Sequence, residues 1–339
     1  MKEIVEPLLN WFELNKRDLE WRKNPSPYEI LISEVMLQQT RVEAVRSYYI
    51  QFLKELPDFN ALAQCPEEKL MKLWQGLGYY NRARNLKKCA IEVIEKYNGI
   101  FPNRYDMAIH LPGIGDYTCG AILSRAYHLR YAAIDGNVLR VLSRYLCFEE
   151  DILKDKTKKH FKEEVEKIMP EEAGKFNEAL MELGATVCMP KVILCSQCPL
   201  SSTCKANKNN TQKLYPKKAE KKEKKILEYT AIFITDGIKY CFIPKPNGVL
   251  KDLPSPFLVE KFLTTMDALE YTTTLGFTPL REIQLEDKIH IFTHQKWLIK
   301  GYKIIVSSLL HYPAYTSEEI KNRLGIPTCF KQFIPEVLD

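Results

Sequence analysis

The stretch LPGIGDYTCGAIL, residues 111–123, joins two segments that have helical hydrophobic periodicity. Its glycines, Gly113 and Gly115, permit backbone conformations that other residues rarely adopt, and they let main-chain N–H groups face outward. These donors stand at the start of the next expected helix, where unpaired N–H groups and the helix dipole favour an anion. The stretch therefore predicts a hairpin that grips a phosphate and positions a nucleic-acid duplex without reading its bases. The glycines alone suit a plain turn between two helices equally well.

Helical periodicity continues on both sides of this hairpin and covers residues 1 to about 205. Ser26 followed by Pro27 is typical of a helix N-cap with a first-turn proline. Further helices are expected at 42–53, 69–74, 82–97, 117–128, 138–146 and 161–169. The pattern predicts a mostly helical first domain, residues 1–204.

The composition changes at residues 205–225, KANKNNTQKLYPKKAEKKEKK, which are lysine-rich and offer almost nothing to bury. We interpret them as a solvated linker, with a phosphate-contacting arm as the alternative.

Beyond the linker the hydrophobic period becomes two, which is typical of strands. The run TAIFITDGIKYCFI, residues 230–243, predicts two strands around a turn at Asp236-Gly237. A second strand pair is expected at 288–297 and 298–306, and an amphipathic helix near 257–275. Residues 226–339 are thus expected to form a smaller α+β domain.

The overall composition is that of a globular protein: 339 residues, 45% hydrophobic and 27% charged, with a net charge of +6. This charge is compatible with a nucleic-acid partner without requiring one. The N-terminus lacks the basic start and apolar run of a signal peptide, and no stretch reaches membrane-spanning length. We therefore expect a cytoplasmic protein with no membrane partner, in which clustered cysteines bind metal rather than form disulfides.

Four of the ten cysteines have metal-ligand spacing: Cys188, Cys195, Cys198 and Cys204 form C-x6-C-x2-C-x5-C within 17 residues. Four thiolates this close can converge on a structural zinc or on a [4Fe–4S] cluster. Zinc sites more often repeat a short knuckle twice, so the six-residue gap favours the cluster.

Two carboxylates are candidates for acid–base chemistry. Glu34 lies at helical spacing from Ile30 and Leu37, on or beside the face expected to be buried, where desolvation favours the neutral acid. Asp135 immediately precedes the helix expected at 138–146, and a helix N-terminus stabilises the ionised form. A proton donor and a fixed negative charge together cleave glycosidic bonds through an oxocarbenium-like state. Each residue alone also suits a structural role, Asp135 as a helix cap and Glu34 as a boundary residue.

Several motifs in register resemble the adenine DNA glycosylase (MutY) family, one of the helix–hairpin–helix iron–sulfur glycosylases. They are SEVMLQQT (33–40), GLGYYNRARNL (76–86), the hairpin, IDGNVLRVLSR (134–144), FNEALMELGA (176–185) and the four-cysteine loop. The resemblance covers residues 12–205 closely. It implies two helical lobes with an adenine pocket between them, a [4Fe–4S] cofactor, and flipping of the target nucleotide out of the duplex.

The resemblance also implies roles for individual residues. Glu34 would protonate the departing adenine, Asp135 would stabilise the sugar cation, and Tyr117 and Asn137 would orient these groups and the attacking water. The implied pocket residues are Trp21, Arg22, Leu37, Glu178 and Met181, and the implied wedges into the base stack are Gln39 and Tyr79. Endonuclease III-like relatives have a lysine at the position of Tyr117 that forms a Schiff base. A phenol cannot, so we expect a monofunctional enzyme.

The C-terminal domain resembles the family's Nudix-like domain, which recognises 8-oxoguanine. Phe292-Thr293-His294 matches a recognition loop that is usually Phe-Ser-His, with Thr293 in the place of the serine. The acidic box of Nudix hydrolases is absent, so nucleotide hydrolysis is not expected.

The sequence therefore predicts a monomeric DNA glycosylase that acts on double-stranded DNA with adenine opposite 8-oxoguanine or guanine. One alternative is a thymine or uracil glycosylase acting opposite guanine, although such relatives lack the acid matching Glu34 and the C-terminal domain. A second alternative is a non-catalytic DNA-binding or iron–sulfur sensing protein.

Overall fold

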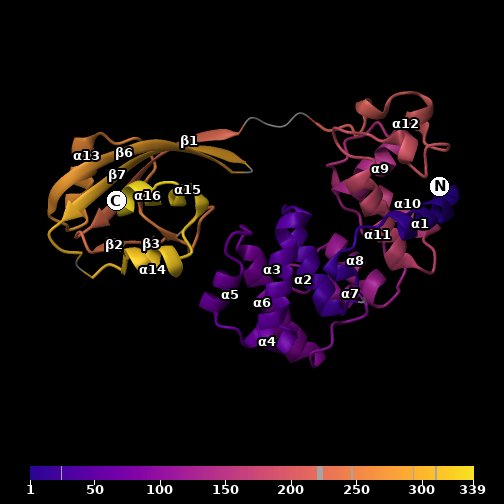
Figure 1. Cartoon of the computed structure of the whole chain (residues 1–339), viewed down its shortest axis with the longest axis horizontal. Coiled ribbons are helices and arrows are strands. Elements are labelled where there is room, and N and C mark those ends of the chain that lie inside the picture. The colour runs from indigo at the N-terminus through magenta and orange to yellow at the C-terminus, as the bar shows by residue number, and fades with distance from the viewer. Residues whose placement is uncertain (24, 220–223, 246, 293, 310) are drawn as a thin grey trace. The chain divides into compact units, whose positions relative to one another are not determined.

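The computed structural model describes residues 1–339 except 24, 220–223, 246, 293 and 310. Its contacts divide the chain into two compact units, Met1–Glu220 and Lys221–Asp339 (Figure 1). No helix in the described part of the chain is long and apolar enough to cross a bilayer.

The first unit is helical. Its α-helices are α1 (Val5–Asn15), α2 (Pro27–Leu37), α3 (Val42–Glu55), α4 (Phe59–Gln64), α5 (Glu67–Leu73), α6 (Asn81–Tyr97), α7 (Tyr105–Ala108), α8 (Asp116–Ala126), α9 (Gly136–Leu146), α10 (Asp155–Ile168), α11 (Ala173–Thr186) and α12 (Lys205–Lys208). Short 3-10 turns are η1 (Lys2–Ile4), η2 (Glu20–Arg22), η3 (Cys195–Gln197) and η4 (Gln212–Leu214). The predicted N-cap of α2 is confirmed: Ser26 Oγ accepts from the Glu29 N–H, and Glu29 returns a bond to the Ser26 N–H. Helix α10 begins earlier than expected, at Asp155.

Two separate hydrophobic cores give this unit the two lobes expected from the resemblance. One core is built from α2–α8 and includes Ile30, Trp74 and Ile122. The other joins α1 to α9, α10 and α11 and includes Phe12 and Phe176. Because α1 packs against α11, the N-terminus completes the lobe that is formed mainly by residues 132–200 (Figure 1).

The first part of the expected linker is not solvated, which corrects the interpretation of 205–225. It contains α12 and η4, and Ala206 and Tyr215 are buried. The buried Arg144 side chain donates to the carbonyl oxygens of Gln212 and Tyr215, both at 3.1 Å. Hydrophobic periodicity missed this packing because the polar stretch contributes mainly backbone acceptors.

The second unit is the predicted α+β domain. Its strands are β1 (Lys225–Thr235), β2 (Lys239–Cys241), β3 (Ile243–Pro244), β4 (Pro254–Ser255), β5 (Phe257–Val259), β6 (Pro279–Ile291), β7 (Gln295–Val306) and β8 (Ala314–Thr316). The main sheet has the order β6-β7-β1-β2-β8, with β5 also paired to β1. Strand β1 is parallel to β7 and antiparallel to β2 and β5.

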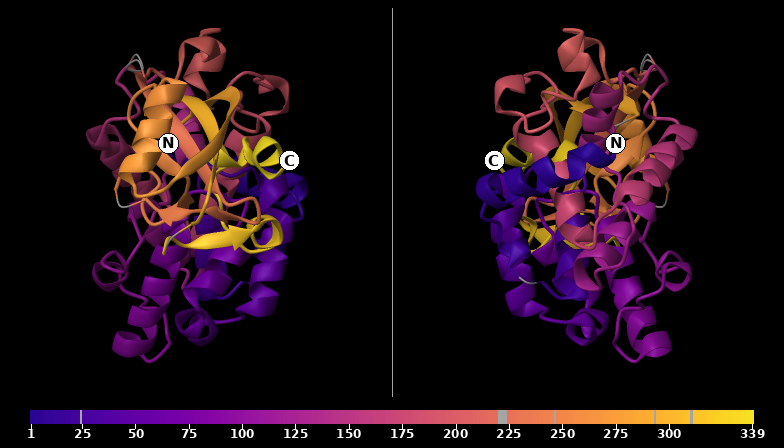
Figure 2. Two further views of the ribbon diagram at one scale, coloured as in Figure 1. Left: turned by 90° about the vertical axis from the view of Figure 1, so that its left-hand side faces the viewer. Right: turned by 90° about the vertical axis from the view of Figure 1, so that its right-hand side faces the viewer.

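Helices cover both faces of this sheet, which explains why the end of β1 is continuously buried. Helix α13 (Thr265–Thr274) contributes Ala268 to one core. On the other face, α14 (Ser317–Asn322), α15 (Thr328–Lys331) and α16 (Ile334–Leu338) contribute Ile320, Phe330 and Val337 (Figure 2).

Two boundaries in this unit differ from the prediction. The helix expected at 257–275 begins only at Thr265, where Thr264 and Asp267 form a capping box, and residues 257–259 are strand β5. The strands expected at 288–297 and 298–306 are shifted. β6 ends at Ile291, and residues 295–297, expected in the first strand, belong to β7. The turn at Asp236-Gly237 is confirmed, since Asp236 Oδ1 accepts from the N–H groups of Ile238 and Lys239.

Candidate active site

A cavity of about 570 Å³ lies where α2, α8, α11 and the segment before α9 meet. Its size is within the range of small-molecule sites. It brings together the residues expected to be catalytic and those expected to form the pocket: Glu34, Tyr117, Asp135, Asn137, Trp21, Arg22, Leu37, Glu178 and Met181, with Gln39 at its edge. These residues come from segments spread over more than 160 positions of the chain.

Glu34 is buried on α2, with 5% of its surface exposed. The Tyr117 phenol donates to Oε2 at 2.5 Å, and Arg125 Nη1 donates to Oε1 at 2.9 Å. Burial raises the pKa of Glu34, and the Arg125 charge and the Tyr117 bond oppose it. Burial and the Glu34 charge together hold the pKa of Tyr117 well above its ordinary value, so Tyr117 remains a hydrogen-bond donor. The expected raised pKa of Glu34 is thus present, with a cationic partner that the sequence did not reveal.

Asp135 is the N-cap of α9. Its Oδ1 accepts from the N–H groups of Asn137 and Val138 at 2.9 and 2.8 Å, and its Oδ2 accepts from Asn137 Nδ2 at 2.7 Å. Burial nevertheless raises the pKa of Asp135 above its ordinary value, against these donors. The sequence argument considered only the helix N-terminus and left out this desolvation. The three donors aim the carboxylate and compensate part of its desolvation cost.

Asn137 connects Asp135 to the cysteine loop. Its Oδ1 accepts from Arg140 Nη2 at 2.7 Å, and Arg140 Nε donates to the Cys188 carbonyl at 2.9 Å. Helix α11 approaches closely at Gly184, where an added Cβ would lie 2.6 Å from Asn137 Cβ. A glycine at this position is what lets α9 and α11 touch.

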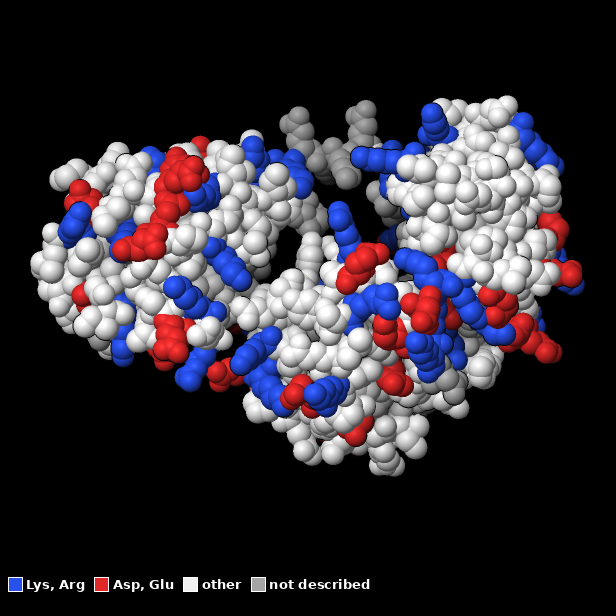
Figure 3. Space-filling model, in the orientation of Figure 1, with Lys and Arg blue, Asp and Glu red and all other residues white. Residues whose placement is uncertain are grey.

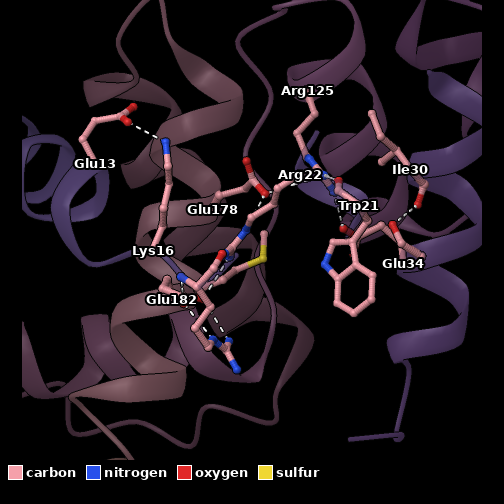
Figure 4. Close-up of polar contacts among 12 residues, drawn as sticks. Glu13, Lys16, Trp21, Arg22, Ile30, Glu34, Arg125, Glu178 and Glu182 are labelled. Carbon is pink, nitrogen blue, oxygen red and sulfur yellow. Dashed lines mark hydrogen bonds and ion pairs between the residues drawn. The ribbon is translucent and has the colours of Figure 1, made fainter. Parts of the chain in front are cut away.

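Sequence reasoning missed the buried charges that organise the pocket (Figure 4). Arg125, with a side chain 6% exposed, bridges Glu34 and Glu178 and donates to the Trp21 carbonyl. Glu182, with a side chain 1% exposed, binds both Arg17 and Arg22. Burial would raise the pKa of Glu182, but the bonds from Arg17 and Arg22 outweigh it and lower the pKa to about 2. The available signal was a charge inside an otherwise apolar helical run, as in GAILSRA, residues 120–126.

The hairpin between α7 and α8 has the expected left-handed residue at Gly113, with φ +79°, and a Cβ there would lie 2.9 Å from Asn85 Cβ. Gly115 differs from expectation: its φ of −104° is open to any residue. Apart from its chain neighbours, no atom of the described chain lies within 4 Å of a Cβ added at Gly115. Basic and acidic side chains are interspersed on the face of the molecule shown in Figure 3.

The two expected wedge residues share an uncommon conformation. Gln39 and Tyr79 have φ of +58° and +49°, and Tyr79 is 53% exposed. Arg82 joins their loops: Nη1 donates to the Gln38 carbonyl at 2.6 Å, and Nη2 donates to the Gly78 carbonyl at 3.1 Å.

Phe292 and His294 of the expected recognition loop lie between β6 and β7. The Phe292 ring packs against Trp297, with centroids 4.7 Å apart, and His294 is exposed. Thr293 lies outside the described residues.

The four cysteines predicted as metal ligands line one small cavity. Arg144 Nη1 lies 3.2 Å from Cys188 Sγ, and Gln212 Nε2 lies 3.7 Å from Cys195 Sγ. Four sulfur donors with N–H groups directed at them fit the ligand set of an iron–sulfur cluster. No set of three His, Cys, Asp or Glu side chains in the described ranges is arranged to hold a single metal ion.

The chain is similar to known DNA repair proteins. Residues 32–167 match the HhH-GPD superfamily of base excision DNA repair proteins. The chain is 35% identical to an adenine DNA glycosylase of Buchnera aphidicola subsp. Baizongia pistaciae, across 96% of this chain and 92% of that protein. It is 40% identical to an adenine DNA glycosylase of Homo sapiens, across 60% of this chain and 39% of that protein.

Solved structures share the fold of the first unit. A thermostable thymine-DNA glycosylase is 30% identical, with a TM-score of 0.57, across 61% of this chain and 96% of that chain. An endonuclease III trapped covalently on DNA is 25% identical, with a TM-score of 0.52, across 62% of this chain and 98% of that chain. Together with the near full-length relative, these similarities show that the chain belongs to the adenine DNA glycosylase family.

Proposed function

We propose that this protein hydrolyses the N-glycosidic bond of adenine mispaired with 8-oxoguanine or guanine in double-stranded DNA. The observation that carries the proposal is the convergence of Glu34, Tyr117 and Asp135 on one cavity. A base cannot reach these groups from inside a duplex, so the adenine has to be flipped out. Gln39 and Tyr79 would enter the stack, and the N–H groups around Gly113 and Gly115 would hold the backbone.

Each buried group has a distinct part in the proposed reaction. Glu34 in its neutral form donates its proton to the adenine as the bond from the base to the sugar breaks. The bonding electrons leave with the base, and the Asp135 carboxylate stabilises the resulting sugar cation. Water adds to the cation, and its proton restores the acid. Tyr117 and Asn137 hold the two carboxyl groups in place through bonds of 2.5 and 2.7 Å.

We further propose that Cys188, Cys195, Cys198 and Cys204 bind a [4Fe–4S] cluster. Bound there, the cluster would cross-link the loop through four thiolates and could exchange electrons. Glu34 and Asp135 supply the proton donation and the cation stabilisation of the proposed reaction. Phe292, Thr293 and His294 would contact the base opposite the adenine. The phenol of Tyr117 cannot form a Schiff base, so strand cleavage is not part of the proposed activity.

A panel of duplexes tests the proposal. Adenine would be placed opposite 8-oxoguanine, guanine or thymine, and thymine and uracil opposite guanine, with base release and strand nicking scored separately. Adenine release opposite 8-oxoguanine without nicking is the expected result. The similarity to a thymine-DNA glycosylase supports a second candidate, which predicts release from the G·T and G·U duplexes instead.

Glu34→Gln keeps the shape of the side chain and removes the acid. We expect a loss of roughly 100-fold or more in the single-turnover rate, with DNA affinity retained. A wild type and a variant that both bind DNA and both release no base would identify a non-catalytic binding protein.

A further inference from the structure

Both carboxyl oxygens of Glu34 are hydrogen-bonded to neighbouring side chains. Both of its oxygens accept, one from Tyr117 and one from Arg125. The Tyr117 hydroxyl can donate to a carboxylate or accept from a neutral carboxyl group, whereas the Arg125 guanidinium can only donate and carries a charge. The contact with Arg125 therefore favours the ionised form of Glu34, although the proposed reaction requires the neutral one.

The charges around Glu34 identify the group responsible. Tyr117 and Arg125 face it from α8, Asp135 from the segment before α9, and Glu178 from α11. The two carboxyl groups favour protonation of Glu34, and Arg125 opposes it. Arg22 also lines the cavity, but it binds Glu178 and Glu182. Arg125 is thus the guanidinium that contacts the proposed acid.

Arg125 is itself held firmly. Its Nη2 donates to the Trp21 carbonyl at 2.6 Å and lies 3.6 Å from Glu178 Oε1. One planar side chain thereby touches the acid, the backbone of one pocket residue and the side chain of another (Figure 4). Because only 6% of the Arg125 side chain is exposed, water screens its charge little.

We propose that Arg125 is a positioning residue that controls the protonation of Glu34, sets the pH range in which it can act as an acid, and couples it to the base-binding residues Trp21 and Glu178. The proposal rests on the proposed function. A general acid is active below its pKa, and its activity is lost as the pH rises through that value. Because the Arg125 charge lowers the pKa of Glu34, removing Arg125 moves this loss to higher pH.

The test is the pH profile of single-turnover adenine release by the full chain. Arg125→Met replaces the guanidinium with an apolar side chain, and the Glu34 carboxylate can still take up a proton. We expect the basic limb of the profile to move to higher pH. Arg125→Lys keeps the positive charge, so the basic limb of its pH profile should stay close to that of the wild type. Arg46→Met is the matched control, because Arg46 is an exposed arginine paired with Glu20.

A further arm separates tuning from structural damage. In the Glu34→Gln background, Arg125→Met should no longer move the pH profile of the residual rate, because no acid remains to be tuned. Should Arg125→Met not fold, Arg125→Gln replaces it in both backgrounds.

An Arg125→Met profile that superimposes on the wild type overturns the proposal, and so does an equal shift in Arg125→Lys. Failure of the proposed function looks different: the wild type would release no adenine at any pH.

Discussion

The Tyr117 hydroxyl donates a 2.5 Å hydrogen bond to Glu34 Oε2, joining residues that are 83 positions apart. The bond crosses from the first turn of α8 to the buried face of α2. It places a residue next to the hairpin directly on the proposed acid. The proposed DNA positioning and the proposed acid chemistry therefore share one short segment of the chain.

Tyr117→Phe should slow base release while leaving DNA affinity nearly unchanged. The variant loses the bond that orients Glu34, and because that bond also lowers the pKa of Glu34, the basic limb of the pH profile should move to higher pH. A rate loss of roughly 5-fold is expected, since a neutral hydrogen bond is worth about 1 kcal/mol. Single-turnover assays across pH measure both effects, and an unchanged profile would contradict the assigned contact.

Arg82→Lys should impair base flipping more than the chemical step. Lysine cannot span the carbonyl groups of Gln38 and Gly78, so the wedge residues Gln39 and Tyr79 lose their common support. We expect slow release of adenine from an ordinary mispair and near-normal release from adenine opposite an abasic site, where unstacking costs less.

The control for Arg82 is Arg84→Lys on the same helix, because the Arg84 guanidinium pairs with Glu67. Equal losses on both substrates would point to general damage instead of a flipping defect.

Gly184→Ala should destabilise the helical unit and lower activity. The added methyl group would meet Asn137 and push apart α9 and α11. Overpacking of this kind costs about 1–3 kcal/mol in the free energy of unfolding. Urea denaturation measures the loss, with Gly136→Ala in the same unit as the control, since apart from its neighbours along the chain no described atom lies within 4 Å of a Cβ there. If the two variants are equally stable, α9 and α11 do not approach each other at Gly184 as closely as described.

Glu182 should make the helical unit sensitive to acid. Its pKa is lowered to about 2 from an ordinary value of 4.5, so it stabilises the fold above the ordinary value and this contribution fades as the pH falls towards 2. The shift corresponds to about 3 kcal/mol. Glu182→Gln should be less stable than the wild type at pH 7, and the difference should shrink near pH 3. A difference that stays constant between these pH values would exclude the titration of Glu182 as its cause.

The cysteine loop should bind iron and sulfide. The purified chain should be brown, and Cys198→Ser should lose both the colour and the bound iron. Because Arg144 holds the loop by bonds to the Cys188 and Met189 carbonyls, Arg144→Met should bleach faster in air. A colourless wild type that contains zinc would refute the cluster.

Much of the molecule follows from local pattern. Helical periodicity, the capping signal at Ser26 and the change to a period of two predict the two units, because burial of one face imposes its period on neighbouring residues. The motifs around Glu34, Tyr117 and Asp135 predict which side chains form the site. The turn at Asp236-Gly237 is likewise readable, since it depends on only a few adjacent residues.

Tertiary structure decided the partners of buried charges. The pairing of Arg125 with Glu34, the support of Arg82 for two loops, and the packing of residues 205–215 around Arg144 all join segments far apart in the chain. The cost of burying a charge depends on every group that surrounds it, whereas periodicity records only neighbours along the chain. For that reason the sequence alone identified the proposed acid, and only the folded chain revealed the guanidinium that controls it.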